Sequence, residues 1–180
     1  NGRPLIALQN STSSTTLMLY SCLSLDCSSG TSVNPGATGG WHPSIVINEG
    51  NAVIAHYDNT NGDLMLYTCE LPYCSSSGGP NIALATTNDI GQQPSIAVGD
   101  NGNPIIAHYD NTNGDLMLYT CTTTDCSTGT NTTLATSGAV GDPIGNVGYN
   151  PSIAIGHDGN PIIAHHDYTD SDLEFTRVYM

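Results

Sequence analysis

Short runs of alternating apolar and polar residues recur along the whole chain, separated by polar turns that contain glycine. Residues 94–98 form one such run, matched by residues 43–47 and 151–155, each opening on proline. A period of two predicts β-strands, with proline at the strand entrance. The turn at residues 100–103 holds a glycine at the offset that a tight hairpin requires, so residues 104–109 predict a second, antiparallel strand.

A third strand is predicted at residues 116–121, after another glycine-containing turn. On one side, Leu64 and Leu66 return in the last repeat as Leu173 and Phe175; the other side carries Met and Tyr residues that are replaced there by Glu174 and Thr176. The leucine side is therefore expected to be core in every copy. The opposite side, polar only in the last copy, is expected to be uncovered there. A fourth strand is predicted at residues 82–86 and 132–136.

The pattern belongs to a repeat of about fifty residues. Residues 51–69 return almost unchanged at 103–121, in a degenerate form at 160–178 and more loosely at 2–22. Four short antiparallel strands per repeat are typical of a propeller blade. A parallel β-solenoid is disfavoured, because its coils are usually shorter and lack a hairpin signal at each connection.

We therefore expect an all-β, β-propeller-like array of about four four-stranded antiparallel units. The predicted units are residues 1–40, 41–91, 92–148 and 149–180, in one repeat domain spanning 1–180. The first copy begins at its second strand, residues 4–8, and the last stops at its third, residues 173–178, so the terminal units are predicted to be incomplete. The two ends differ from each other and both have an unpaired strand edge, which favours head-to-tail association of subunits. The alternative interpretation is that the chain is a fragment of a longer propeller.

The six cysteines occur as three C-x4-C pairs at one position of the repeat: Cys22 and Cys27, Cys69 and Cys74, and Cys121 and Cys126. A tetrahedral zinc site would need four ligands, whereas each pair lies in its own unit, so disulfides within each unit are favoured over a metal site. Disulfides indicate an oxidising compartment. No run approaches the roughly 18 apolar residues that span a bilayer, and no signal-like segment is present, which fits a mature exported protein.

The string PSIAxGxxGNPIIAHxDxxxxDLxxxxC, which starts at Pro94 and recurs from Pro151 with Val178 in place of the cysteine, resembles tandem repeats of secreted bacterial proteins. Those repeats are similar to blades of sialidase-type propellers. The resemblance covers essentially the whole chain and implies a fold, without an established activity. Sialidases bind a sugar carboxylate through an arginine cluster, whereas this chain has only Arg3 and Arg177 and no complete Ser-x-Asp-x-Gly-x-Thr-Trp box.

The charge balance narrows the classes of partner. Lysine is absent, the formal net charge is −14, and charged residues make up only 10% of the chain. This field repels phosphate backbones and anionic headgroups, so neither nucleic acid binding nor membrane insertion is expected. Solubility provided by neutral polar groups is common in extracellular proteins.

Histidine recurs at one position of the second strand, as His56, His108 and His165, where the first copy has Leu8. A ring of histidines could bind a metal or ligand, but packing between blades is favoured, because a metal site would not accept the leucine. Three aromatic residues could form sugar-stacking platforms, with inter-blade packing as the competing interpretation. They are Trp41, Tyr57 and Tyr109.

Two further candidate sets lie in polar segments. Asp58 and Asp63, with Asp110 and Asp115, could supply oxygen ligands to calcium, although aspartate is also an ordinary residue of such turns. Calcium is the one cofactor considered; no other is expected. Asn10 and Asn131 begin glycosylation sequons.

Catalysis is disfavoured, because the carboxylates repeat with the turns instead of forming one unique pair in differing environments, and no nucleophile-elbow motif is present. The sequence predicts an extracellular or cell-surface, non-catalytic structural or adhesive module that forms a homo-oligomer or head-to-tail filament. A carbohydrate-binding lectin is the first alternative, and a secreted glycan-active hydrolase is the second.

Overall fold

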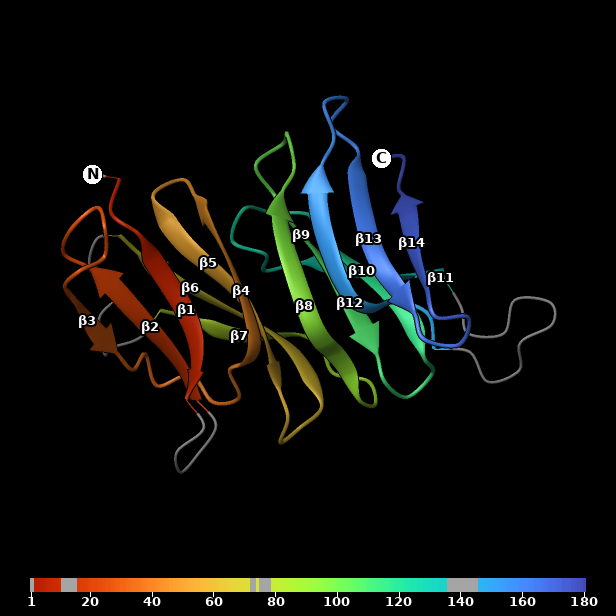
Figure 1. The fold of residues 1–180 in the computed structure, drawn as a ribbon, viewed down its shortest axis with the longest axis horizontal. Helices are drawn as coiled ribbons and strands as arrows, with labels where there is room; N and C mark the ends of the chain where they lie inside the picture. The colour runs from red at the N-terminus through yellow and green to blue at the C-terminus, as the bar shows by residue number, and fades with distance from the viewer. Residues whose placement is uncertain (1, 11–15, 72–73, 75–78, 136–145) are drawn as a thin grey trace.

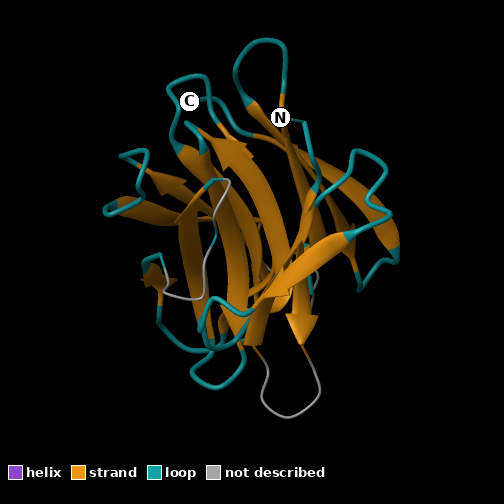
Figure 2. Ribbon diagram, turned by 90° about the vertical axis from the view of Figure 1, so that its left-hand side faces the viewer, coloured by secondary structure: helices purple, strands orange, loops and turns teal. Residues whose placement is uncertain are grey.

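The computed structural model describes the 180-residue chain except for residues 1, 11–15, 72–73, 75–78 and 136–145. The described residues contain strands and loops and no helix (Figure 2). The strands are β1 (Leu5–Asn10), β2 (Thr16–Cys22), β3 (Gly30–Val33), β4 (Trp41–Asn48), β5 (Asn51–Asp58), β6 (Asp63–Glu70), β7 (Asn81–Ala85), β8 (Ile90–Val98), β9 (Pro104–Asp110), β10 (Asp115–Cys121), β11 (Gly129–Ala135), β12 (Tyr149–Ile155), β13 (Pro161–Asp167) and β14 (Asp172–Arg177).

These strands form four antiparallel sheets that follow one another along the molecule (Figure 1). Within the described residues, the first sheet has the order β1-β2-β3, the second β4-β5-β6-β7, the third β8-β9-β10-β11 and the fourth β12-β13-β14. Every sheet is a meander, because each hairpin connects neighbours in sequence. The predicted all-β, propeller-like array with two smaller terminal units is confirmed.

The first strand of the repeat lies where neighbouring sheets meet, since β8 contacts both β4 and β12. These strands begin earlier than predicted, at Trp41, Ile90 and Tyr149, so proline does not mark the strand entrance. The register shifts across the proline in each strand, and His42, Gln93 and Asn150, the residues before the prolines, have positive φ. A β-bulge separates the early residues from the regular ladder, which the simple alternation of side chains does not reveal.

Each sheet has two distinct faces. The front face is defined as the face that carries the leucines of the repeat's third strand, such as Leu64 and Leu66. The opposite face is called the back face. The front face of each of the first three sheets packs against the back face of the next. In the second interface, Leu64 and Leu66 meet Ile96 and Ile106; clusters of the same kind join the other pairs of sheets.

Glycine allows the chain to pass closely from one sheet to the next. A Cβ atom on Gly91 would lie 2.5 Å from the backbone of Leu64, and one on Gly148 would lie 2.5 Å from the backbone of Leu116. Both glycines have a φ of 94°. The entering segment is also fixed by a backbone hydrogen bond from Ile90 N–H to the Gly62 carbonyl, at 2.9 Å. Positive φ and close backbone approach both require glycine here.

The fourth sheet reverses one expectation. Its polar face, with Glu174 and Thr176, is the back face and is turned toward the third sheet, where Thr176 bonds the buried His165. Its front face carries Leu173 and Phe175, which are 67% and 69% exposed. The prediction that the leucine side is core in every copy is therefore wrong for the last copy, whereas Glu174 on the polar side is partly exposed, as predicted. Alternation distinguishes two faces of a strand but does not identify the one that meets a neighbouring sheet.

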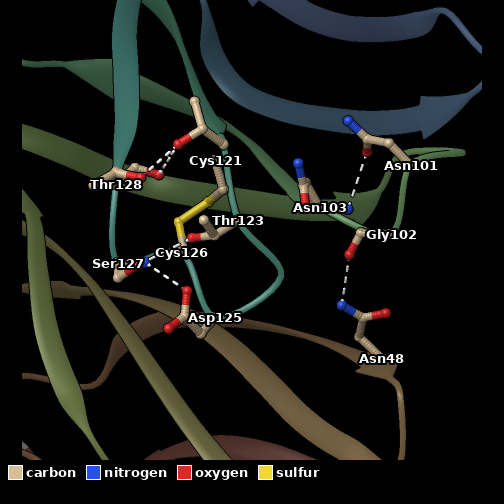
Figure 3. Close-up of a disulfide and its surroundings, with 11 residues drawn as sticks. Asn48, Asn101, Gly102, Asn103, Cys121, Thr123, Asp125, Cys126, Ser127 and Thr128 are labelled. Atoms are coloured by element: carbon tan, nitrogen blue, oxygen red, sulfur yellow. Dashed lines mark hydrogen bonds between the residues drawn. A yellow bond between two sulfur atoms is a disulfide. The ribbon is translucent and has the colours of Figure 1, made fainter.

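All three cysteine pairs form disulfides within their own units, as predicted, and no free cysteine remains. Each bond spans the connection between the repeat's third and fourth strands. Figure 3 shows Cys121 and Cys126 in this hairpin, where the Asp125 carboxylate accepts a hydrogen bond from the Ser127 backbone N–H at 3.1 Å.

Candidate functional site

The repeated histidines lie on the back faces of three successive sheets. His56, His108 and His165 are all buried. The Nε2 atom of His56 lies 2.9 Å from Asn81 Oδ1, and that of His108 lies 2.8 Å from Asn131 Oδ1. Backbone N–H of Gly40 donates to His56 Nδ1 at 3.1 Å, so Nε2 carries the proton and donates to Asn81. These rings therefore hold together strands of their own sheets, and His56 also holds the segment that enters β4.

Burial also keeps these rings uncharged. Desolvation lowers the pKa of His108 to about 4, although its hydrogen bond to Asn131 acts in the opposite direction. The pKa values of His56 and His165 are lowered for the same reason. A neutral imidazole can bind a metal, but the described residues contain no group of three or more His, Cys, Asp or Glu side chains that could hold one.

The two candidate tyrosines also lie between sheets. Tyr57 and Tyr109 are buried on front faces, and each hydroxyl bonds the segment that enters the next sheet, at Asp89 and Asn146 respectively. Burial raises the pKa of Tyr57 to about 12, and the neighbouring Asp89 acts in the same direction. Neither ring offers an exposed face on which a sugar could stack.

Asp89 belongs to a polar cluster at this junction. Its carboxylate accepts hydrogen bonds from Tyr57, Gln92 and Asn111, the last at 2.7 Å. Burial alone would raise the pKa of Asp89, but these donors stabilise the carboxylate and lower the pKa overall. The cluster fixes the entry to β8, and its hydrogen-bonding capacity is largely used within the protein.

Trp41, the remaining aromatic candidate, is half-buried at the start of β4. Its ring meets His42 edge to face, with centroids 5.9 Å apart. Its Nε1 atom is one of four buried side-chain polar atoms without a hydrogen-bond partner in the described part of the chain.

The calcium candidates lie in the hairpins that join the repeat's second and third strands. Asp58 accepts hydrogen bonds from the Thr60 backbone and the Asn61 amide, both at 2.9 Å, and Asp110 repeats this turn. Asp63 lies opposite Asp58 in the hairpin, and burial together with the Asp58 charge raises the pKa of Asp63. Asp115 lies opposite Asp110 in the same way. The Asp58 and Asp110 carboxylates therefore serve the turns, as is usual for aspartate there.

The two sequon asparagines occupy different settings. Asn131 lies in β11, and its amide oxygen is the partner of His108. Asn10 is the last residue of β1, and the rest of its sequon lies outside the described residues.

The fourth sheet brings together three aromatic rings that the sequence did not single out. The Tyr149 and Tyr168 rings lie 6.3 Å apart, and the His166 and Tyr168 rings lie 5.9 Å apart. Tyr168 is largely exposed. His166 lies at the repeat position that Tyr57 and Tyr109 occupy, and Tyr168 lies where the middle repeats have asparagine. These differences between the last repeat and the others could have revealed the group from the sequence.

A shallow pocket of about 390 Å³ opens between the second and third sheets, near the disulfide of the third. Apolar side chains of β7 and the Tyr119 ring line it, together with Thr68, Asp125 and Ser127. Its walls contain a single carboxylate, so it lacks the pair of carboxyl groups that glycoside hydrolysis normally uses.

In sequence, the chain matches no protein-family profile and no curated protein. In structure, it is similar to xylan β-1,4-xylosidase from Bacillus halodurans C-125, with a TM-score of 0.60 and 14% identity. The similarity covers 99% of this chain and 40% of the xylosidase, so the chain spans less than half the length of that protein. At this identity the comparison supports the fold alone, an all-β, propeller-like arrangement.

Proposed function

We propose that the protein is an extracellular structural repeat module without catalytic activity. The observation that carries this proposal is the use of its repeated polar side chains. The histidines, tyrosines and aspartates that recur with the repeat bond strands, turns and the segments between sheets, as His56 does with Asn81 and Tyr57 does with Asp89. A scaffold uses polar side chains in this way, whereas an active site needs them directed at a substrate.

The disulfides support the proposed location. Three disulfides indicate an oxidising compartment. Among the described residues, no helix is long and apolar enough to cross a membrane. A secreted or cell-surface setting accounts for the disulfides and for the low content of charged residues.

The test is a turnover assay with the purified, oxidised protein. Xylan, aryl xylosides and a panel of other glycans should show no hydrolysis above a heat-denatured sample. Calcium should change neither this result nor the unfolding temperature. Turnover that is lost on substitution of the carboxylate at the 390 Å³ pocket, Asp125→Asn, would instead support a hydrolase.

A glycan-binding role is the second candidate, favoured by the aromatic group of Tyr149, His166 and Tyr168, in which the Tyr168 ring is exposed. Aromatic faces can stack on sugar rings. A saturable signal on a glycan array that is lost in Tyr168→Ala and retained in Tyr179→Ala would support it. Tyr179 is a suitable control because it is exposed but stacks beneath Arg177, outside this group.

A further inference from the structure

The front face of the fourth sheet exposes apolar side chains that the repeat buries everywhere else. Leu173 is 67% exposed, whereas its equivalents Leu17, Leu64 and Leu116 are fully buried. Phe175 is 69% exposed, and Ile162 also reaches the surface. The equivalents of these residues pack against the back face of the following sheet.

The back face of the first sheet has the complementary exposure. Ile6 is 45% exposed, whereas its equivalents Ile54, Ile106 and Ile163 are fully buried against the preceding sheet. Leu8, in the position of the buried histidines, is 39% exposed. This face therefore has the composition of an inter-sheet back face, and none of the four described sheets packs against it.

All three internal interfaces join a front face to a back face, and none joins two faces of the same kind. We propose that the front face of the fourth sheet, around Leu173 and Phe175, binds the back face of the first sheet, around Ile6 and Leu8, of a second copy of this chain. The contact continues the internal stacking across two molecules. It rests on the proposed structural role and specifies its partner.

The contact is heterologous, because two different surfaces meet. Such a contact closes into a ring or continues as a filament, depending on the rotation between copies, and both assemblies use the same two faces. The incoming first sheet is one strand narrower than the second and third sheets. Association is therefore expected to be reversible and dependent on concentration.

Electrostatics gives this contact a distinctive salt response. Each copy carries a formal charge of −14, so two copies repel each other, while the surfaces that meet are apolar. Added salt screens the repulsion and leaves the apolar contact in place. Self-association should therefore strengthen with salt, in contrast to a contact held by ion pairs.

Sedimentation velocity of the oxidised full chain over a range of concentrations tests the proposal. The wild type should self-associate, and Phe175→Asp and Ile6→Asp should each weaken association by roughly ten-fold or more. Ile47→Asp is the matched control: Ile47 is 55% exposed in β4, within the array and outside both docking faces, so this variant should associate like the wild type. Circular dichroism and thermal unfolding of each variant check that the fold is retained.

Mixing the two variants distinguishes the proposed pairing from alternatives. Ile6→Asp retains the front face and Phe175→Asp retains the back face, so their mixture should form a capped heterodimer while each alone stays monomeric. A front-to-front dimer would instead survive in Ile6→Asp. Either that result or a wild type that stays monomeric to millimolar concentration at high salt would overturn the proposal.

The outcome is separable from that of the turnover assay. A monomeric chain without turnover would remove the docking contact and leave the non-catalytic role in place. A self-associating chain with turnover would support the docking contact and overturn the non-catalytic role. Glycan binding at Phe175 in a chain that stays monomeric would assign this face to a sugar and overturn the docking contact.

Discussion

The amide oxygen of Asn131 lies 2.8 Å from the Nε2 atom of His108, so the asparagine of a glycosylation sequon is the partner of a buried imidazole. The same relationship joins Asn81 to His56 at 2.9 Å, although Asn81 is not part of a sequon. The recurrence of the pair in both four-stranded sheets indicates that Asn131 is placed there for the histidine.

Replacing Asn131 with alanine should therefore destabilise the fold. Asn131→Ala leaves a buried N–H donor without its acceptor, which costs about 1–3 kcal/mol in the free energy of unfolding. Thr133→Ala removes the same sequon but retains the hydrogen bond, and it should leave stability nearly unchanged. Urea denaturation measures both. Equal losses in the two variants, together with a glycan mass on Asn131, would assign the effect to glycosylation instead.

The strands could be predicted from the sequence because two local signals agree. Residues such as Leu116 and Leu118 recur at every second position and share one face of β10, and glycine marks the tight turns. The bulges at His42, Gln93 and Asn150 escaped prediction, because non-glycine residues with positive φ leave little trace in composition.

The roles of the candidate site residues were less predictable, because they depend on which faces of neighbouring sheets pack against each other. The repeat identifies His56 and His108 as equivalent, and the leucine at the same position favours a packing role. The leucine side of the last copy was incorrectly predicted to be core, because exposure is set by the neighbouring sheet and not by the side chains of the strand. Asn131 illustrates the same limit: its partner His108 is a neighbour in space, two strands away in the sheet.

Acid should destabilise the protein through its buried histidines. The pKa of His108 falls from 6.5 to about 4 on folding, so the unfolded state binds more protons between these values, and stability falls as pH decreases from about 6.5 toward 4. When the pH falls from 7.5 to 5, protonation of His108 in the unfolded state alone should lower the free energy of unfolding by about 2 kcal/mol. Urea unfolding at both pH values measures the loss. His108→Leu, which introduces the residue that the first copy carries at this position as Leu8, should reduce the loss, and an unchanged slope would contradict the assignment.

The disulfides should contribute to stability individually. A bond that closes a short loop, such as Cys121–Cys126, stabilises by about 2 kcal/mol in the chain-entropy estimate. The double variant Cys121→Ala/Cys126→Ala should lose at least this amount and should respond less to reductant than the wild type. Peptide mapping without reduction should recover the three pairs within their units. A pair between units would be incompatible with the hairpins.

The close passage at Gly91 should be a sensitive backbone position at the junction of the second and third sheets. Gly91 and Gly50 both have positive φ, at 94° and 81°, but an added Cβ on Gly91 would lie 2.5 Å from Leu64, whereas one on Gly50 would meet nothing within 4 Å. Gly50→Ala should therefore cost about 1 kcal/mol, from its backbone conformation alone. Gly91→Ala adds a clash with the backbone of a buried strand and should cost at least about 3 kcal/mol or prevent folding. Thermal and urea unfolding of the two variants provide the comparison. Similar losses would mean that the second and third sheets can separate at this junction without a large cost, and that the glycine serves only its φ angle.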